Sequence, residues 1–260
     1  MSASPKDPFF IGFLPAPAGL RPFLISTMLS VVAFFAALGA MMALSQDDPG
    51  DGSFRFDLGR QTVTGVLETT PYPIVHITEG NETIPRGHTL MVSGQGKNGA
   101  IGRGAPLNGQ LVTISGVLLT RGDLDMMQLR GGRNGLAAAE TAEERAAPAE
   151  APAPEPLGTW RLAGEICDGK CLAGAMRPGR GLSHKACADL CIEGGIPPVF
   201  VSSQPVAGEE FLLITGPEGT PLPEAARDWI ATFVHVEGEI TRHGSLLVFA
   251  IDPNTLEPIE

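Results

Sequence analysis

The hydrophobic pattern of the chain changes sharply after residue 44. Residues 23–44, FLISTMLSVVAFFAALGAMMAL, form an apolar run of twenty-two positions without a charge. A helix rises ~1.5 Å per residue, so a helix of this length spans the ~30 Å hydrocarbon layer of a bilayer. We therefore predict one transmembrane helix over residues 23–45, which follows a short N-terminal segment, residues 1–22.

The charges on either side of this run predict its orientation. Lys6 and Arg21 precede it, whereas Asp47, Asp48 and Asp51 follow it. Because basic flanks stay on the cytoplasmic side, we expect a cytoplasmic N-terminus and a periplasmic C-terminal part in a bacterial inner membrane. A cleaved signal peptide is the alternative, but its apolar region is normally only ~7–15 residues long.

Beyond the helix, short runs of alternating apolar and polar residues occur twice in the same order. The matching pairs are LGRQTVTGVL (58–67) with LGTWRLAGEI (157–166), TLMVSG (89–94) with FLLITG (211–216), and QLVTISGVLLTRG (110–122) with FVHVEGEITRHG (233–244). Each run contains a glycine at the equivalent place, which suits strands that bend into a small closed barrel. We predict a mainly β fold with two tandem OB-like barrels, residues 54–132 and 157–256. An immunoglobulin-like sandwich is the alternative, and it needs about seven strands in each half.

Composition agrees with this pattern and narrows the choice of partners. The chain has 33 Gly and 23 Pro among 260 residues, which favours short strands and many turns. The segment between the repeats, residues 133–156, is rich in Ala, Glu and Pro, so we expect an extended linker. The formal net charge of -11 provides no basic surface to neutralise phosphates, and we expect no nucleic-acid partner.

All four cysteines lie in the second repeat, at a place where the first repeat has none. Cys167 and Cys171 are spaced C-x3-C around a predicted turn. His184, Cys187 and Cys191 follow with the spacing i, i+3 and i+7, which places them on one face of a short helix. Thiolates and an imidazole are ligands of Zn(II) and Cu(I). We therefore predict a metal site for zinc or copper that is formed by these five residues.

Disulfide bonds are the first alternative for these cysteines, because an exported protein meets an oxidising compartment. Geometry favours bridges from the turn to the helix, which would join Cys167 or Cys171 to Cys187 or Cys191. A catalytic dithiol that uses Cys167 and Cys171 is a second alternative. Residues 167–191 carry four basic and two acidic side chains, and such cations favour thiolate.

Haem is a less favoured cofactor. His184 or Met176 would supply an axial ligand, and nearby cations would hold an anionic propionate, but the C-x-x-C-H attachment motif is absent. The sequence also contains no phosphate loop, no nucleophile elbow and no HExxH motif. These observations favour a binding protein over an enzyme.

The second repeat resembles a known group of sequences. The segment from Cys167 to Phe200 contains HKACADLC and GGIPP, and VEGEITRHGSLLVFAI follows it. In these features it is similar to uncharacterised bacterial exported or membrane-anchored proteins with an H-x2-C-A-x2-C segment inside an OB-like barrel. The resemblance covers roughly residues 157–256 and implies the fold and the site, not an activity.

Together these features predict a membrane-anchored periplasmic binding module with a Cys/His metal site. We expect it to be an accessory, assembly or electron-transfer subunit of an inner-membrane protein complex. The alternatives are a periplasmic thiol-disulfide or metal-dependent redox enzyme, and a disulfide-stapled structural subunit without metal.

Overall fold

The computed structural model describes residues 17–45, 50–139 and 150–259. Its contacts divide the chain into two compact units, Met1–Asp48 and Pro49–Glu260, which we treat separately. Most of the predicted N-terminal segment and residues 140–149 of the predicted linker lie outside the described residues.

The first unit contains one long helix, α1 (Arg21–Ser45). Its segment Arg21–Met42 has a mean hydropathy of 2.2, and none of its side chains is buried by other parts of the protein. The hydroxyl of Ser26 donates to the carbonyl of Phe23, so this polar group is satisfied within the helix. A helix that exposes apolar side chains on every side is typical of a membrane anchor or a signal sequence.

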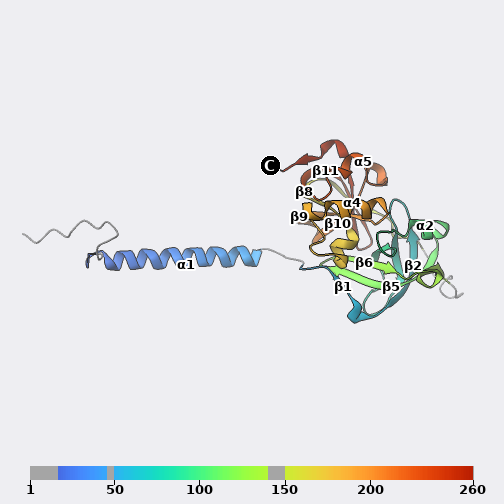
Figure 1. The fold of residues 1–260 in the computed structure, drawn as a ribbon, viewed down its shortest axis with the longest axis horizontal. Helices are drawn as coiled ribbons and strands as arrows, with labels where there is room; N and C mark the ends of the chain where they lie inside the picture. Colours follow the sequence, from blue (N-terminus) through green and yellow to red (C-terminus); the bar gives the residue numbers. More distant parts are fainter. Residues whose placement is uncertain (1–16, 46–49, 140–149, 260) are drawn as a thin grey trace, which may run out of the picture. The chain divides into compact units, whose positions relative to one another are not determined.

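The second unit contains two closed barrels of five strands each, as predicted (Figure 1). The first barrel consists of β2 (Gln61–Glu68), β3 (Ile74–Glu79), β4 (Thr89–Ser93), β5 (Leu111–Arg121) and β6 (Leu124–Leu129). The second consists of β8 (Glu155–Asp168), β9 (Pro198–Val206), β10 (Glu209–Thr215), β11 (Phe233–His243) and β12 (Leu246–Ile251).

Both barrels have the same topology. In the first barrel β2 pairs with β3 and β3 with β4, β4 runs parallel to β6, and β5 closes the ring between β6 and β2. The second barrel repeats this order with β8, β9, β10, β12 and β11, and its parallel pair is β10 with β12. The repeated sequence runs therefore occupy equivalent strands of two OB-type barrels.

The repeated glycines explain how the strands close. Gly65 in β2 and Gly164 in β8 are equivalent, as are Gly116 in β5 and Gly238 in β11. A Cβ atom at any of these positions would collide with a carbonyl oxygen of the neighbouring strand. Only glycine permits this close backbone approach where the strands curl into a narrow barrel.

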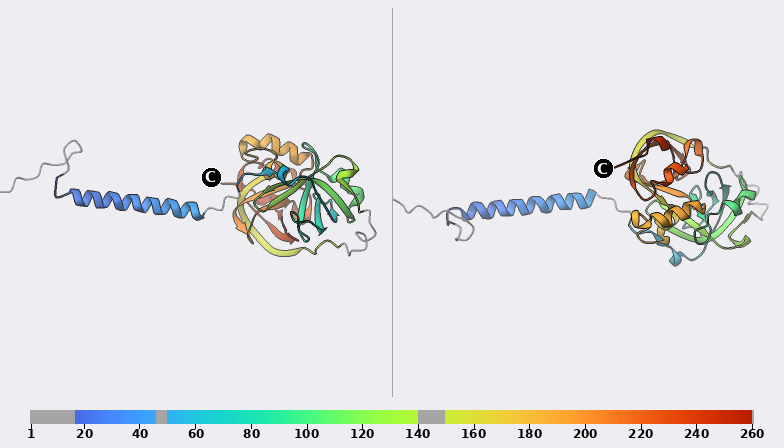
Figure 2. Two further views of the ribbon diagram at one scale, coloured as in Figure 1. Left: turned by 90° about the horizontal axis from the view of Figure 1, so that it is seen from below. Right: turned by 45° about the horizontal axis from the view of Figure 1, so that its top comes forward.

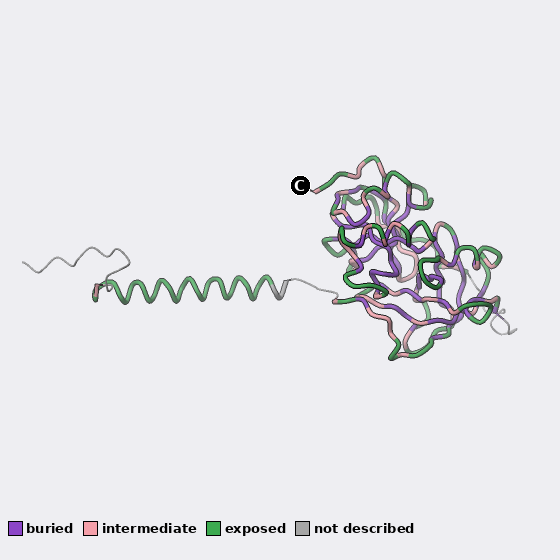
Figure 3. The backbone as a smooth tube through the Cα atoms, viewed as in Figure 1, coloured by how far each residue is buried: buried purple, intermediate pink, exposed green. Residues whose placement is uncertain are grey.

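The first barrel buries apolar side chains on both faces of its strands. Residues that point into the barrel, such as Val75, Leu90 and Met127, form its own core. Their neighbours in sequence, including Met91 and Met126, belong to the core that is centred on the second barrel. The second barrel, coloured yellow to red, therefore lies against the first, coloured cyan to green (Figures 1 and 2), and the buried backbone continues from one to the other (Figure 3).

Short elements complete the second unit. Among the described residues, α2 (Ile101–Gly104), α4 (Lys185–Glu193) and α5 (Glu224–Arg227) are α-helices outside the barrel strands. The short strands β1 (Ser53–Phe54), β7 (Leu136–Ala138) and β13 (Glu257–Pro258) extend the sheets. Strand β7 lies in the segment that we predicted as a linker, and it pairs with β5 of the first barrel.

Candidate metal centre

The turn that carries Cys171 begins where strand β8 ends, at Asp168. The Oδ1 atom of Asp168 accepts a hydrogen bond from the backbone N–H of Cys171 at 2.8 Å. Gly169 donates its N–H to the carbonyl of Pro197 at 2.9 Å, and it has no room for a Cβ atom beside that carbonyl. A π-helical turn, Cys171–Ala175 (η4), follows, so Cys171 occupies the first position of this turn.

Helix α4 carries the other two cysteines of the cluster. A short 3-10 turn, Leu182–His184, leads into it, and no side chain caps the N-terminus of the helix. At the C-terminus Gly195 adopts a φ of 86° and Ile196 donates its N–H to the carbonyl of Cys191. A glycine in the left-handed region is a common end of an α-helix, because it lacks a Cβ atom.

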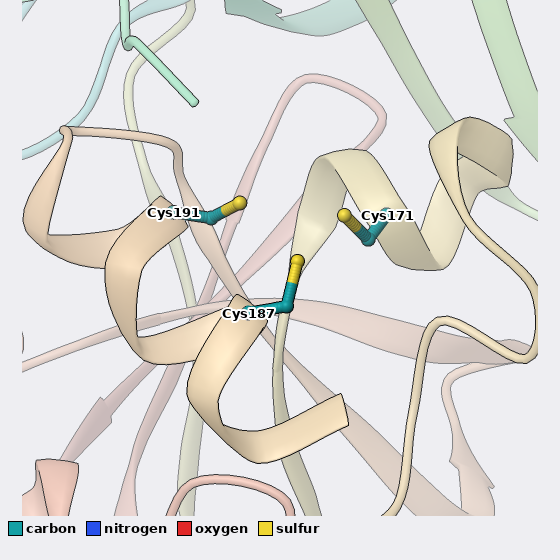
Figure 4. Close-up of side chains that lie close together, drawn as sticks. All are labelled: Cys171, Cys187 and Cys191. Atoms are coloured by element: carbon teal, nitrogen blue, oxygen red, sulfur yellow. The ribbon is translucent and has the colours of Figure 1, made fainter. Parts of the chain in front are cut away.

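The sulfur atoms of Cys171, Cys187 and Cys191 form one cluster. The three Sγ atoms lie within 4.8 Å of one another. Figure 4 shows Cys187 and Cys191 one turn apart on the same face of α4, with both thiols directed toward Cys171. Cys171 and Cys191 are buried, whereas Cys187 is half-buried. We call these three residues the thiol cluster.

His184 belongs to a second group that shares Cys171 with the thiol cluster. Ligand atoms of Asp168, Cys171 and His184 lie within 4.8 Å of one another. The imidazole Nε2 of His184 lies 2.9 Å from Oδ2 of Asp168, and both side chains are almost completely buried. The imidazole is therefore adjacent to the thiol cluster, but its Nε2 already contacts a carboxylate.

Cys167 lies in neither group of potential ligands in the described part of the chain. Its thiol donates to Oε1 of Glu165 at 3.1 Å, and Oε2 of Glu165 lies 3.4 Å from Nε of Arg180. Burial and the adjacent carboxylate raise the pKa of Cys167 well above its usual value. The thiol of Cys167 is therefore protonated near neutral pH.

Two lysines surround the thiol cluster, and one of them comes from the first barrel. The Nζ atom of Lys97 donates to Sγ of Cys187 at 2.8 Å and lies 3.6 Å from Sγ of Cys191. Lys170 is buried and donates to the carbonyls of Gly94 and Gly96 at 2.7 and 2.8 Å. The loop 94–99 of the first barrel is thus held by one lysine of the second barrel and supplies another lysine to the thiols.

Cys171 and Cys191 have unequal acidities because they share a proton. The pKa of Cys191 is lowered to about 7, mainly by the hydrogen bond that Cys171 donates to it and also by Lys97, against the effect of burial. The same hydrogen bond, together with burial and Asp168, raises the pKa of Cys171. Burial lowers the pKa of Lys170, whereas the hydrogen bond to Cys187 raises that of Lys97. Near neutral pH the thiol cluster therefore already contains a thiolate.

The spacing of residues in the sequence indicated the three cysteines of this cluster and the neighbouring His184, but no pattern indicated Lys97 or Asp168 as parts of the site. Lys97 lies in a glycine-rich turn, and nothing in its own sequence connects it with cysteines ninety residues away. Asp168 directly follows Cys167, and its position before a turn was the available signal.

None of the disulfide pairings considered from the sequence is present, because all four cysteines are free thiols. The residues considered as haem ligands have different environments. Met176 is 46% exposed, and His184 is buried against Asp168.

Comparison of the chain with known protein families, curated proteins and solved structures gives no match. The fold and the site define the class directly: a protein with two five-stranded β-barrels, an N-terminal apolar helix, and a cluster of cysteine and histidine residues that can bind a metal ion.

Proposed function

We propose that this protein is a membrane-anchored periplasmic module that binds a metal ion, zinc or copper, through Cys171, Cys187 and Cys191. The observation that carries the proposal is the convergence of three sulfur atoms within 4.8 Å on two separate elements, η4 and α4. Thiolates bind soft or borderline metals in preference to calcium or magnesium.

The surroundings of the cluster support this chemistry. A thiol must lose its proton to bind a metal, so the lowered pKa of Cys191 reduces the cost of binding. In this proposal the Asp168–His184 pair orients the turn that carries Cys171, because His184 contacts Asp168 and Asp168 accepts the N–H of Cys171. Such outer contacts keep metal ligands in position.

The apolar helix supports the membrane part of the proposal. We interpret α1 as an uncleaved anchor with a cytoplasmic N-terminus, and the two barrels as periplasmic. We place the protein as an accessory, assembly or electron-transfer subunit of an inner-membrane complex, in the group of exported OB-like proteins that its second repeat resembles.

Metal analysis of the full-length protein, purified in mild detergent from its native membrane, tests the proposal. We expect about one zinc or copper ion per chain and four free thiols after denaturation. The triple variant Cys171→Ser, Cys187→Ser, Cys191→Ser should lose the metal. Cys167→Ser is the matched control, because this cysteine is buried in the same barrel but lies outside the cluster, and it should retain the metal.

Two outcomes of the metal analysis would count against the proposal. Oxidised cysteines and no metal in the native protein would contradict the proposal and indicate a structural subunit. Equal metal content in the triple variant and the wild type would show that the ion binds elsewhere.

A thiol-disulfide enzyme is the second candidate, and one observation favours it. Cys171 and Cys191 share a proton, and the pKa of Cys191 is close to neutral, as in reactive dithiols. The working pair would then be Cys171 and Cys191. Cys167, which we predicted as the partner of Cys171 in such an enzyme, instead donates a hydrogen bond to Glu165. A redox titration distinguishes this candidate, since an enzyme of this class has one pair that titrates near the potential of its compartment.

A further inference from the structure

We infer that the thiol cluster selects Cu(I), bound by three sulfurs, and that Lys97 of the first barrel closes the site. This inference rests on the proposed metal-binding function and specifies the ion.

The described residues provide three converging donors and no fourth. His184 and Asp168 have ligand atoms within 4.8 Å of Cys171, but neither belongs to the group that contains Cys187 and Cys191. The thiol of Cys167 is directed to Glu165. Structural zinc sites are almost always tetrahedral with four protein ligands, whereas Cu(I) is a soft ion that thiolates select. Three sulfurs therefore complete a site for Cu(I) but not a structural site for Zn(II).

The cation beside the sulfurs favours an ion with a single charge. The Nζ atom of Lys97 lies 2.8 Å from Sγ of Cys187 and 3.6 Å from Sγ of Cys191. A positive side chain at this distance repels a doubly charged ion more strongly than a singly charged one.

Lys97 lies at the outer side of the cluster. Cys187 is the only member of the thiol cluster that is half-buried, and Lys97 contacts its sulfur and its carbonyl oxygen at 2.8 and 3.2 Å. A zinc ion with three protein ligands needs water at the fourth position. An ammonium group has no lone pair to offer a metal, so Lys97 occupies the exposed side without becoming a ligand.

The loop that carries Lys97 is fixed against the second barrel. Gly99 donates its N–H to the carbonyl of Gly194 at 2.7 Å, directly after α4 ends. Neither Gly99 nor Gly194 has room for a Cβ atom, because each would collide with the carbonyl of the opposite segment. The first barrel therefore contributes a rigidly held cation to a site whose sulfurs all belong to the second barrel.

Competition measurements on the full-length, metal-free protein in detergent, under reducing and anaerobic conditions, test the inference. We expect one Cu(I) per chain to be retained against the chromophoric chelator bicinchoninate. Zn(II) should be lost to pyridylazoresorcinol. X-ray absorption of the copper-loaded protein should show sulfur ligands without a nitrogen ligand.

Two lysine variants isolate the contribution of the first barrel. Lys97→Gln should weaken Cu(I) binding by roughly 10–100-fold, the range expected when an outer partner of a metal ligand is removed. Lys185→Gln is the matched control, because Lys185 lies on α4 but donates to the carbonyls of Asp228 and Ile230 instead of the thiols. It should bind Cu(I) as the wild type does.

The possible contrary results have different meanings. Tighter retention of Zn(II) than of Cu(I), or a nitrogen ligand in the copper spectrum, would overturn the inference and leave the proposed metal-binding function intact. Identical Cu(I) affinities for Lys97→Gln and Lys185→Gln would overturn the role of Lys97. Failure to bind either metal would overturn the proposed function itself.

Discussion

At the scale of single residues, cysteines of the second barrel differ in acidity, and the chemistry of the site depends on this difference. Cys167 is buried beside a carboxylate, and its pKa is raised well above the usual value. Cys191 accepts a hydrogen bond from Cys171 and lies near Lys97, and its pKa is lowered to about 7. Residues of one type in one barrel thus differ in protonation because each contacts a different partner.

The acidity of Cys191 leads to a pH prediction for the metal-free protein. Because the pKa is lowered, the thiolate forms as the pH rises through about 7, below the ~8.5 of an ordinary cysteine. We expect the ultraviolet absorbance of the thiolate to rise with a midpoint near pH 7 in the wild type. Lys97→Gln should move this midpoint to higher pH, since it removes a cation that stabilises the thiolate.

Cys191→Ser and Cys167→Ser provide the controls for this titration. The first should abolish the transition near pH 7, and the second should leave it unchanged. A wild-type protein in which no thiolate forms below the ordinary cysteine range would disprove the shared proton between Cys171 and Cys191.

At the scale of elements, the barrels depend on glycines at which neighbouring strands approach closely. Gly238 in β11 lies so near β12 that a Cβ atom would collide with the carbonyl of Ala250. The same collision occurs in the first barrel, where Gly116 faces Gln128. The internal repeat therefore preserves a steric requirement of the barrel as well as a hydrophobic pattern.

We predict that Gly238→Ala lowers the free energy of unfolding by about 1–3 kcal/mol, the usual effect of excess volume in a packed region. Denaturant unfolding measured by circular dichroism would show this change. Gly102→Ala is the control, because Gly102 lies in α2 with no atom within 4 Å of the added Cβ. It should raise the stability slightly, by up to about 1 kcal/mol, because alanine favours helix. Equal stability of the two variants would contradict the steric explanation.

At the scale of the whole molecule, the two barrels form one compact unit although each is a closed ring. Adjacent apolar residues such as Met126 and Met127 explain this. Met127 packs into the first barrel, whereas Met126 packs into the core that includes the second barrel. Strands whose two faces are both buried carry continuous apolar runs instead of strict alternation. The sequences TLMV (89–92) and MM (126–127) therefore indicate that these strands pack on both faces, one of them against the second barrel.

The anchor is the other prediction at this scale. We expect the mature protein to keep its N-terminal helix, and its mass should therefore remain close to the 27.2 kDa of the full chain. It should sediment with membranes and dissolve only in detergent, because the apolar segment Arg21–Met42 is not buried inside the protein. Mass spectrometry and N-terminal sequencing of the native protein provide the measurement. A mature chain that begins after residue 44 would identify a cleaved signal sequence instead.

The sequence by itself determined the features that depend on local periodicity. Twenty-two uncharged positions predict the helix, and alternating runs with glycines at equivalent places predict two equivalent barrels. The spacing of Cys187 and Cys191 specified a common helix face, because residues four apart lie one turn from each other. These features need only the geometry of neighbouring residues.

The tertiary structure alone decided which chemical groups meet. It excluded Cys167 from the thiol cluster, paired His184 with Asp168, and brought Lys97 to Cys187 across ninety positions of sequence. Such contacts follow from the packing of one barrel against the other and from the close fit of Gly99 to Gly194. Local propensities contain no information about this fit, since it results from the shapes of two complete barrels.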